Sequence, residues 1–357
     1  MRTGIFRIAI IAAVIIWGGT NNRSSAQISD MGLILAGGIS DAEKIGAAYL
    51  SPYTEAFGAN LNAGWYNTAN THRLLGFDLT FSLNIAAVPD NARRFDLNDI
   101  EGLTGTFTGD GIAPTVASKM DNRPEMQYFD GNVNYMLPDG TGLGYIPAPT
   151  LHLGVGLPKD TDIIIRYMPD VKFGRSGHLG LWGLGIKHSV KQWIPVLRRM
   201  PVFNLSVMGG YTSFTNSTGL NFMPADIGAI DNTTAAVTFD NQKMEFSVNS
   251  YTANLIASAD IPFFSFYGGV GFNSGSSSLK MLGYYPIPEL DGTDIVVNDS
   301  SIQEKDPVNI KMNNGDSKLQ PRFNAGLKFK LAVIHIHFDY IYSNYSVGSV
   351  GLGINFR

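Results

Sequence analysis

The sequence contains no cysteine. Without thiols the chain can form neither a disulfide scaffold nor a thiolate metal site. A lipoprotein anchor is excluded as well, because its attachment needs a cysteine. The absence suits a chain that crosses an oxidising compartment unfolded, although it does not identify that compartment.

Charge and long apolar runs are also scarce. Charged residues make up 16% of the chain, against ~25% in average soluble proteins. The net charge is −4 and no basic block occurs, so nothing indicates a nucleic-acid partner. After residue 26, no apolar run approaches the ~20 residues of a spanning helix. What is abundant is glycine, at 40 residues, with 21 Phe and 15 Tyr. This balance leaves a secreted all-β domain or a transmembrane barrel.

The N-terminus has the three parts of a signal peptide. Arg2 and Arg7 precede an apolar run at residues 8–17, and Ser24-Ser25-Ala26 forms a small-x-small cleavage site. We therefore expect residues 1–26 to be removed during export, with a short membrane anchor or a buried helix as the alternative.

Apolar and polar residues alternate along much of the remaining chain. In residues 75–85 the odd positions are apolar, whereas the even positions are Gly76, Asp78, Thr80, Ser82 and Asn84. A half-buried β-strand has this period of two. The period recurs at residues 151–157, 203–207, 323–331, 334–340 and 350–357.

A soluble β-sandwich also alternates, but two features favour a membrane barrel. The strands are long, roughly the 9–11 residues that a tilted strand needs to cross a bilayer. Their polar faces are rich in glycine and small polar residues, as suits a crowded or water-filled lumen. The sequence therefore predicts an all-β fold, a transmembrane antiparallel β-barrel over residues 59–357.

The strand connections are mostly short and long in turn. Outer-membrane barrels have short periplasmic turns and long external loops. Tight turns are expected at Ala332-Val333, Ile261-Pro262 and residues 158–160. Longer connections at the other end are expected at residues 170–176, 215–246 and 274–321. Residues 343–346 would be a short loop at that same end.

The strand count follows from the same pattern. About eleven strands are recognisable, the first near residues 61–67. An even number is expected when both ends of the barrel lie in the periplasm. One more strand must therefore lie within residues 89–147, and residues 127–136 are the best candidate. The prediction is 12 strands, with 14 as the alternative.

A helical plug or cap is expected before the barrel, within residues 27–58. Ser40-Asp41-Ala42-Glu43 resembles a capping box. Ile45, Tyr49, Tyr53 and Phe57 follow as an apolar stripe. Because a barrel of 12–14 strands is wider than side chains alone can fill, this segment should plug the lumen or cap its periplasmic rim. In the lumen, Tyr49 and Phe57 would touch inward residues such as Asp78 or Thr80 or their neighbours.

A second, short amphipathic helix is expected at residues 189–200. Val190, Trp193, Ile194 and Leu197 share a face opposite basic residues. Such a helix at a periplasmic turn would lie in the headgroup plane of the inner leaflet.

Alternation also assigns charged residues to the inner face of the barrel. Both signs occur, so they either set a field for polar solutes or, as we favour, pair across strands. His335, His337 and Asp339 share one face, which would allow a zinc site. A polar wall that uses histidine is the favoured interpretation, and no metal ligand or cofactor is predicted. The lumen-lining candidates are Asp78, His152, Asp162, Arg166, Lys187, Asp260, Arg322, Lys328, Lys330, His335, His337 and Asp339.

Aromatic residues near strand ends should form girdles at the membrane interfaces. Phe356 and Arg357 end the last alternating strand, as in the insertion signal that the barrel-assembly machinery reads. The girdle candidates are Trp65, Tyr167, Trp182, Tyr211, Tyr340 and Tyr342.

Several stretches resemble a known family. They are Asp41-Ala42-Glu43-Lys44, residues 49–53, Gly64-Trp65-Tyr66-Asn67-Thr68-Ala69, Gly185-Ile186-Lys187-His188-Ser189, Trp193-Ile194-Pro195 and residues 351–357. Over most of its mature length the chain resembles an uncharacterised Bacteroidota family of outer-membrane β-barrels, a domain of unknown function. A helical segment before a mid-sized barrel is also remotely similar to the long-chain fatty-acid transporter family. The resemblance implies the outer membrane of a Gram-negative bacterium and assigns no catalytic or ligand residues.

The expected function is an outer-membrane channel or transporter for small or hydrophobic solutes, gated by the N-terminal helices. The alternative is a non-transporting barrel that docks partners of the envelope or secretion machinery. No nucleophile elbow, P-loop or zinc-protease motif indicates an enzyme. The expected partners are the lipid bilayer with its lipopolysaccharide, and the barrel-assembly machinery. An obstructed lumen would favour docking, and a lateral opening beside the helices would favour transport.

Overall fold

The computed structural model describes most of the chain. It covers residues 39–356, except 129–130, 132, 174–176, 222, 228, 235–238, 240, 288, 293, 303–305 and 313–318. The expected signal peptide at 1–26, the start of the helical segment at 27–38 and Arg357 therefore lie outside the described residues.

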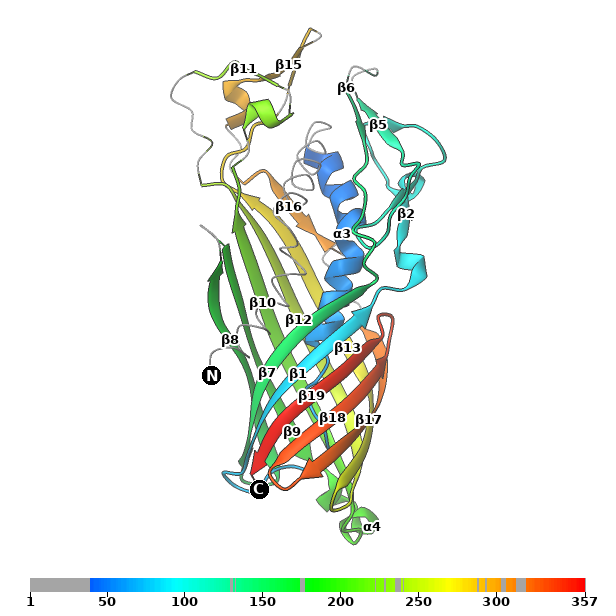
Figure 1. The fold of residues 1–357 in the computed structure, drawn as a ribbon, viewed down its shortest axis with the longest axis vertical. Helices are drawn as coiled ribbons and strands as arrows, with labels where there is room; N and C mark the ends of the chain where they lie inside the picture. Colours follow the sequence, from blue (N-terminus) through cyan, green and yellow to red (C-terminus); the bar gives the residue numbers. More distant parts are fainter. Residues whose placement is uncertain are drawn as a thin grey trace.

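Ten antiparallel strands form a closed barrel (Figure 1). Neighbours along the chain pair with one another, β12 pairs with β13, and β1 pairs with β19 to close the ring. The barrel strands are β1 (Phe77–Ala87), β7 (Tyr145–Leu157), β8 (Thr161–Phe173), β9 (Gly177–Ser189), β10 (Phe203–Gly219), β12 (Lys243–Asp260), β13 (Phe264–Leu282), β17 (Gln320–Leu331), β18 (Ile334–Tyr342) and β19 (Val347–Phe356).

The prediction of 12 strands is wrong, because two segments counted as strands lie elsewhere. Residues 61–67 follow the end of an N-terminal helix and run through the lumen. Residues 127–136 contribute β5 (Glu125–Tyr128) and β6 (Val133–Met136) to a separate small sheet with β3 (Thr106–Phe107). Period-two alternation cannot distinguish a barrel strand from an extended segment that binds inside the barrel or above it.

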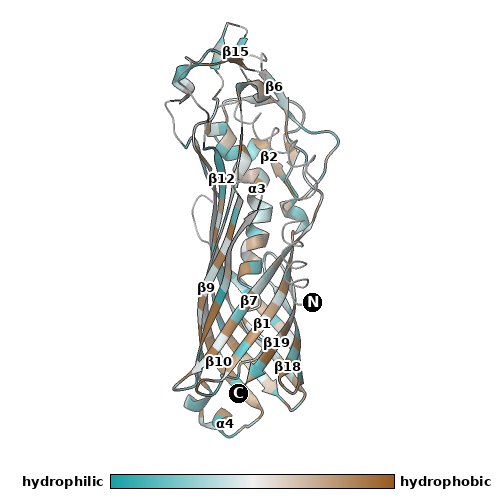
Figure 2. Cartoon of the chain, turned by 60° about the vertical axis from the view of Figure 1, so that its left-hand side comes forward, coloured by the Kyte–Doolittle hydropathy of each residue, from teal (hydrophilic) through white to brown (hydrophobic). Residues whose placement is uncertain are grey.

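In the barrel strands the apolar side chains are exposed and the polar ones are buried, which is the reverse of a soluble protein. In β18 the exposed side chains are Ile334, Ile336, Phe338, Tyr340 and Tyr342, and the residues between them are buried. Hydrophobic and hydrophilic residues alternate along the wall in Figure 2. The polar side chains face a filled interior, and the apolar ones form the outer surface.

The strand connections divide between the two ends of the barrel. One end has the tight turns at 158–160, 261–263 and 332–333, together with the C-terminus (Figure 1). The opposite end, which the sequence predicts to be the external one and which is called external below, has the loops at 88–144, 220–242 and 283–319. The predicted alternation of turns and loops is confirmed.

The helix expected at residues 189–200 is broken. β9 continues to Ser189, and a 3-10 turn (Lys191–Trp193) precedes the short helix α4 (Pro195–Arg198) at the tight-turn end. Pro195 occupies the first turn of α4, and it has no N–H with which to continue an earlier turn.

The external loops carry structure of their own. β2 (Arg94–Asp96) pairs with β4 (Ile112–Pro114), and β11 (Ile230–Asp231) joins β14 (Glu289–Asp291) and β15 (Asp294–Val297) in a three-stranded sheet. β16 (Val308–Lys311) pairs with the outer part of β13. The 3-10 turns are Asp90–Ala92, Leu97–Asp99, Pro224–Ile227 and Asp299–Ile302.

The helix α3 (Ile39–Leu61) descends from these loops into the barrel (Figure 1). Pro52 lies within it and leaves the Ala48 carbonyl without its usual helical donor. The Ser51 hydroxyl donates to that carbonyl at 3.3 Å, which lets the helix continue. No helix in the described part of the chain is long and apolar enough to cross a membrane.

Candidate functional site

The N-terminal end of α3 is fastened to the external loops. The Asp41 carboxylate accepts hydrogen bonds from the Thr104 and Gly105 amides at 2.9 and 3.0 Å. The Glu43 carboxylate accepts the Asn309 amide at 2.8 Å. These contacts replace the predicted capping box, because both carboxylates accept hydrogen bonds from amides outside the helix. The helix therefore lies in the lumen as a plug and enters it from the end that carries the long loops.

A hydroxyl group in the first loop completes this anchor. Tyr128 donates to Asp41 at 3.1 Å. Burial raises the pKa of Tyr128, and the neighbouring Tyr135 and Asp41 raise it further. The phenol therefore stays protonated and keeps donating at any physiological pH.

The apolar stripe of α3 packs against the upper wall and the loops. Ile45 is fully buried, and the Phe57 ring lies 4.5 Å from Phe214 and 6.4 Å from Phe246. The Tyr49 hydroxyl donates to the Asp139 carbonyl at 2.8 Å, and Tyr53 donates to the Leu143 carbonyl at 3.0 Å. The predicted contact of the stripe with inward wall residues is met by Phe57, but its partners are not the named Asp78 or Thr80, because the helix lies higher in the barrel.

Residues 62–76, here called the lumen segment, fill the lower barrel between α3 and β1. Its beginning is bound by two arginines of the wall. Arg166 donates to the Leu61 and Ala63 carbonyls at 2.7 and 2.5 Å, and its guanidinium lies 3.7 Å from the centre of the Trp65 ring. Arg322 donates to the Asn62 carbonyl at 2.8 Å. Both arginines are 2% exposed or less, so these contacts replace water as their partners.

Further along, polar wall residues hold the lumen segment on several sides. Lys328 donates to the Asn67 side chain at 2.8 Å, and Lys187 donates to the Asn70 carbonyl at 3.0 Å. The Asp162 carboxylate lies 3.0 Å from both His72 Nδ1 and Lys187 Nζ. The lower lumen is therefore a hydrogen-bonded plug.

Glycines in the wall make room for the plug. A Cβ at Gly185 would lie 2.7 Å from the Trp65 indole, and one at Gly210 would lie 2.8 Å from it. Trp65 itself is 2% exposed, so its prediction as a membrane girdle residue is wrong. The inward glycines were the sequence signal for a large occupant at this height.

The structure places the predicted lumen residues on the inner side of the wall. Among them, His335 and His337 have ring centres 6.0 Å apart, but Asp339 accepts a hydrogen bond from Asn324 at 2.9 Å. No cluster of three metal-ligating side chains occurs in the described ranges. The buried members are Asp78, His152, Asp162, Arg166, Lys187, Arg322, Lys328, His335, His337 and Asp339.

The remaining two candidates pair with each other. Lys330 Nζ lies 3.3 Å from the Asp260 carboxylate, and Asn204 donates to the same carboxylate at 2.8 Å. Thr68 of the lumen segment also donates to Asp260, at 3.0 Å. Cross-strand pairing is thus combined with binding of the plug.

The barrel wall is incompletely paired between β7 and β8. Their ladder runs from Leu157 and Thr161 up to His152 and Arg166 and then stops. Above it, β7 continues to pair with β1, and β8 continues to pair with β9. The two strands diverge towards the external end in Figure 1. We call this split the β7–β8 seam.

Prolines and a β-bulge lie just beyond the point where the β7–β8 ladder stops. The pairing of β8 with β9 shifts its register between Met168 and Val171. Gly156 exchanges backbone bonds with residues 75 and 76 on the β1 side, so the odd residues of β7 direct their backbone groups towards β8. Continuing the ladder by its own register would place Pro149 opposite Pro169. Neither proline has an N–H to donate. The position that should exchange two hydrogen bonds can therefore form none.

The seam begins at the outer row of aromatic residues. Tyr167, one residue beyond the last paired position, is 61% exposed and lies opposite Trp182. The Trp182 ring packs edge-on against Tyr211 with ring centres 5.2 Å apart, and the tilted rings of Tyr211 and Tyr251 have centres 4.8 Å apart. Such a row marks a membrane–water interface. An open strand edge is not tolerated within hydrocarbon, so an opening at this height is physically consistent.

An apolar cavity of 40 Å³ lies behind the seam. It is lined by Phe57 and Leu61 of α3, Pro147 and Pro149 of β7, and Met168 of β8, among others. The cavity has room for a small group and not for a whole solute, so a larger occupant would require α3 to move.

Residues 1–356 of the chain match the model of the family of unknown function DUF6588. The chain belongs to this family. Among the curated proteins, none matches the DUF6588 chain.

Solved structures similar to this DUF6588 protein include several outer-membrane proteins. Ail of Yersinia pestis is 13% identical, with a TM-score of 0.22, over 79% of this chain and 99% of that one. The outer-membrane protease OmpT of Escherichia coli is 10% identical, with a TM-score of 0.32, over 81% and 100%. The toluene transporter TodX of P. putida is 7% identical, with a TM-score of 0.22, over 79% and 90%. At these values the likeness says nothing about function.

Proposed function

We propose that this protein is an outer-membrane transporter of small hydrophobic solutes, which pass through the β7–β8 seam under the control of α3. The observation that carries the proposal is the seam with its apolar cavity. A hydrophobic solute at the outer interface would meet apolar side chains there, whereas the rest of the wall is paired.

The membrane placement rests on the surface of the barrel. The outward side chains of β13 and β18 include Phe264, Phe266, Phe272, Phe338 and Tyr340, all more than one third exposed. Exposed apolar surface of this extent needs lipid or a partner, and a closed barrel leaves no strand edge in hydrocarbon. We propose the outer membrane of a Gram-negative bacterium, with the Bacteroidota source and the similarity to fatty-acid transporters as predictions.

The plug determines how such a transporter would open. The lumen segment is tied to β1 at the periplasmic end and, through α3, to the external loops. It therefore cannot swing out into the periplasm as a free domain. Opening requires α3 to shift away from the seam, followed by a rearrangement of residues 62–76.

A disulfide that fixes α3 to the wall tests the gate. A Cβ at Gly58 would lie 3.6 Å from the Ser250 hydroxyl oxygen, so the side chains at these two positions are neighbours and can be joined through two sulfur atoms. The chain has no native cysteine, so the pair Gly58→Cys and Ser250→Cys has no competing thiol. Cells carrying it should lose uptake of the hydrophobic dye N-phenyl-1-naphthylamine when oxidised and regain it when reduced.

The control disulfide joins the wall without touching α3. Thr215 and Ser247 are cross-strand partners in β10 and β12, so Thr215→Cys with Ser247→Cys should leave dye uptake unchanged. If the Gly58 and Ser250 disulfide forms and uptake persists, α3 is not a gate.

The second candidate function is docking of envelope or secretion partners without transport. The observation that favours it is the hydrogen-bonded lower lumen together with the small sheets of the external loops. Persistent dye uptake in the locked variant, equal to that of cells lacking the protein, would favour docking. In neither candidate does the protein act as an enzyme.

Assembly and lipid contacts are proposals of the same kind. Phe356 is 46% exposed and its ring lies 5.0 Å from Phe77, where β19 meets β1. We propose that the barrel-assembly machinery reads Phe356 and Arg357, and that the exposed band contacts the bilayer and lipopolysaccharide. Deleting the two residues should leave periplasmic aggregates, and normal membrane levels would contradict this.

A further inference from the structure

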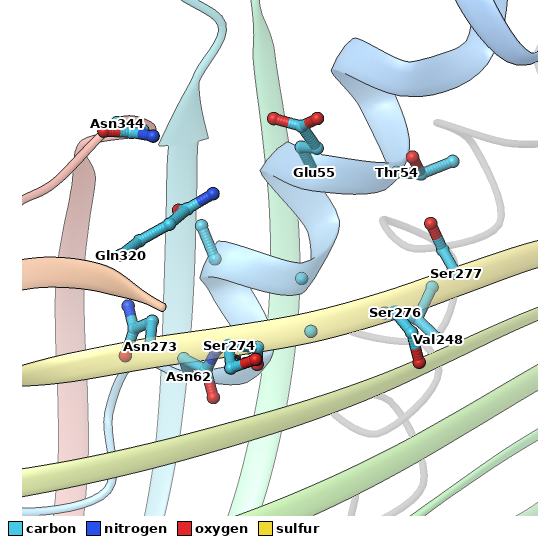
Figure 3. A pocket seen from close by; sticks show the side chains of 13 residues that line it. Thr54, Glu55, Asn62, Val248, Asn273, Ser274, Ser276, Ser277, Gln320 and Asn344 are labelled. Atoms are coloured by element: carbon cyan, nitrogen blue, oxygen red, sulfur yellow. Dashed lines mark hydrogen bonds between the residues drawn. The ribbon is translucent and has the colours of Figure 1, made fainter. Parts of the chain in front are cut away.

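A polar cavity of 220 Å³ lies beside α3, towards β13 and the external mouth (Figure 3). Thr54 and Glu55 of α3 line it together with Asn273 and Ser277 of β13. A space of this volume holds several waters, and water satisfies hydroxyl and amide groups of this kind. The cavity therefore indicates hydration of the helix and no particular solute.

The opposite, tight-turn end of the barrel exposes apolar side chains in its connections. In the β9–β10 connection, Trp193 is 68% exposed and Val196 is 71% exposed. Phe263, in the β12–β13 turn, is 68% exposed as well. We call residues 190–202, 261–263 and 330–334 the lower rim. Further exposed apolar residues of the lower rim are Met200, Val202, Ile261 and Val333.

The connections of the lower rim lie side by side. Backbone hydrogen bonds of 2.8, 2.8 and 2.7 Å run from the Asp260 amide to the Val202 carbonyl, from Lys330 to Phe263, and from Asn355 to Val333. The exposed apolar residues therefore form one continuous arc below β10, β12, β13, β17 and β18, with α4 at this end of the barrel (Figure 1). A continuous exposed apolar surface indicates contact with a membrane or a partner.

The charged side chains of the lower rim are all basic. They are Lys191, Arg198, Arg199 and Lys330. Lys330 lies 3.3 Å from the Asp260 carboxylate, so the net positive charge comes from the β9–β10 connection, where Arg198 and Arg199 are exposed. The neighbouring 158–160 turn differs, because its Lys159 and Asp160 carry opposite charges. An apolar surface that carries only cations matches a lipid surface with anionic headgroups.

The β9–β10 connection is continuous with the outer surface of the barrel. The Trp193 ring centre lies 5.2 Å from that of His188. His188 lies on the same face of β9 as Leu184 and Ile186, which are both 54% exposed. Trp193 therefore packs against the outer side of the wall and does not cover the mouth of the barrel. Tryptophan is enriched where a membrane protein meets the headgroups.

We propose that the lower rim binds anionic phospholipid headgroups of the leaflet at the tight-turn end, with Arg198 and Arg199 at the phosphates and Trp193 and Val196 against the acyl chains. A soluble protein partner would have to cover an arc that continues into the exposed outer face of the wall, whereas a leaflet covers both surfaces at once. The proposal rests on the proposed membrane placement, and it depends on neither the seam nor transport.

Nitroxide labels on single cysteines test whether lipid covers the lower rim, since the chain has no native cysteine. The full-length protein is placed in nanodiscs of phosphatidylglycerol and phosphatidylcholine. A label at Val196→Cys should collide more with oxygen, which concentrates in lipid, than with a water-soluble nickel chelate. Phe338→Cys on the outer wall is the lipid reference, and Asp121→Cys in the first external loop is the water reference.

The two labels on the barrel separate this proposal from the membrane placement. Nickel access at Val196→Cys beside oxygen access at Phe338→Cys would overturn the proposal and favour a protein partner at the lower rim. Nickel access at both positions would overturn the membrane placement as well.

Native mass spectrometry of the full-length protein in detergent tests the headgroup preference. Phosphatidylglycerol should be retained about tenfold more than phosphatidylcholine. Each cation near an anionic surface contributes about fivefold, so Arg198→Gln with Arg199→Gln should lower this preference about fivefold or more. The matched control, Arg94→Gln with Lys119→Gln, makes the same charge change at exposed positions of the first external loop and should leave the preference unchanged. Equal retention of both lipids by the wild type, or an equal loss in both double variants, would overturn the proposal.

Discussion

Restoring the missing backbone donors should close the β7–β8 seam. The pair Pro149→Val and Pro169→Val gives each strand an N–H where the continued ladder would exchange two hydrogen bonds. A net ~0.5–1.5 kcal/mol per bond makes the zipped state about 2 kcal/mol more favourable. At 1.4 kcal/mol per factor of ten, the ratio of open to zipped seams should fall ~30-fold.

Two measurements check this reasoning separately. Hydrogen exchange of the Leu151 amide, which points towards β8, should slow in the variant, because it becomes paired. Uptake of N-phenyl-1-naphthylamine should fall by ~10-fold or more if solutes use the seam. Pro321→Val, a proline substitution in β17 away from the seam, should change neither. Unchanged exchange would refute the role given to the prolines, and slowed exchange with full uptake would refute the route.

Three further outcomes test the plug and its orientation. Because α3 enters from the external loops, Ser40→Cys should react with an impermeant maleimide on intact cells, whereas Arg199→Cys at the opposite end should react only after permeabilisation. The reverse pattern would refute the orientation. Deleting residues 39–58 should leave single-channel conductance low, since the lumen segment remains, whereas deleting residues 39–76 should raise it; equal conductance would place the block elsewhere. Arg166→Met leaves two buried carbonyls without their donor and should lower the free energy of unfolding by about 2–4 kcal/mol in urea titrations, and an unchanged midpoint would contradict the assigned contacts.

Much of the barrel could be predicted from local pattern. Alternation along residues 334–342 and 347–356 predicts strands with one apolar and one polar face. The two-residue turn at Ala332-Val333 predicts a hairpin between the strand before it and the strand that begins at Ile334. The lengths of the connections then assigned the short turns to one end of the barrel and the long loops to the other. The helical N-terminal segment was predictable because its apolar stripe has the spacing of a helix.

The strand count and the candidate site depended on tertiary structure. Residues 61–67 have the composition of a strand, and only their surroundings, Arg166, Arg322 and the inward glycines, make them a plug. The same alternation serves a strand in the wall and an extended segment inside it, because both present side chains at a period of two. The direction of α3 depends on Asp41 and Glu43 meeting loops more than sixty residues away.

The seam was only partly predictable from the sequence. Pro149 and Pro169 are visible in the sequence, and each by itself indicates only a strand edge or a bulge. Their consequence appears because the register fixed by Leu157 and Thr161 would place them opposite one another if the ladder continued. The sequence by itself determined the inverted faces, the ends and the helix, since these follow from the periodicity of single segments. The plug, the seam and the two cavities were decided by the tertiary structure, because each arises where segments distant in the chain meet.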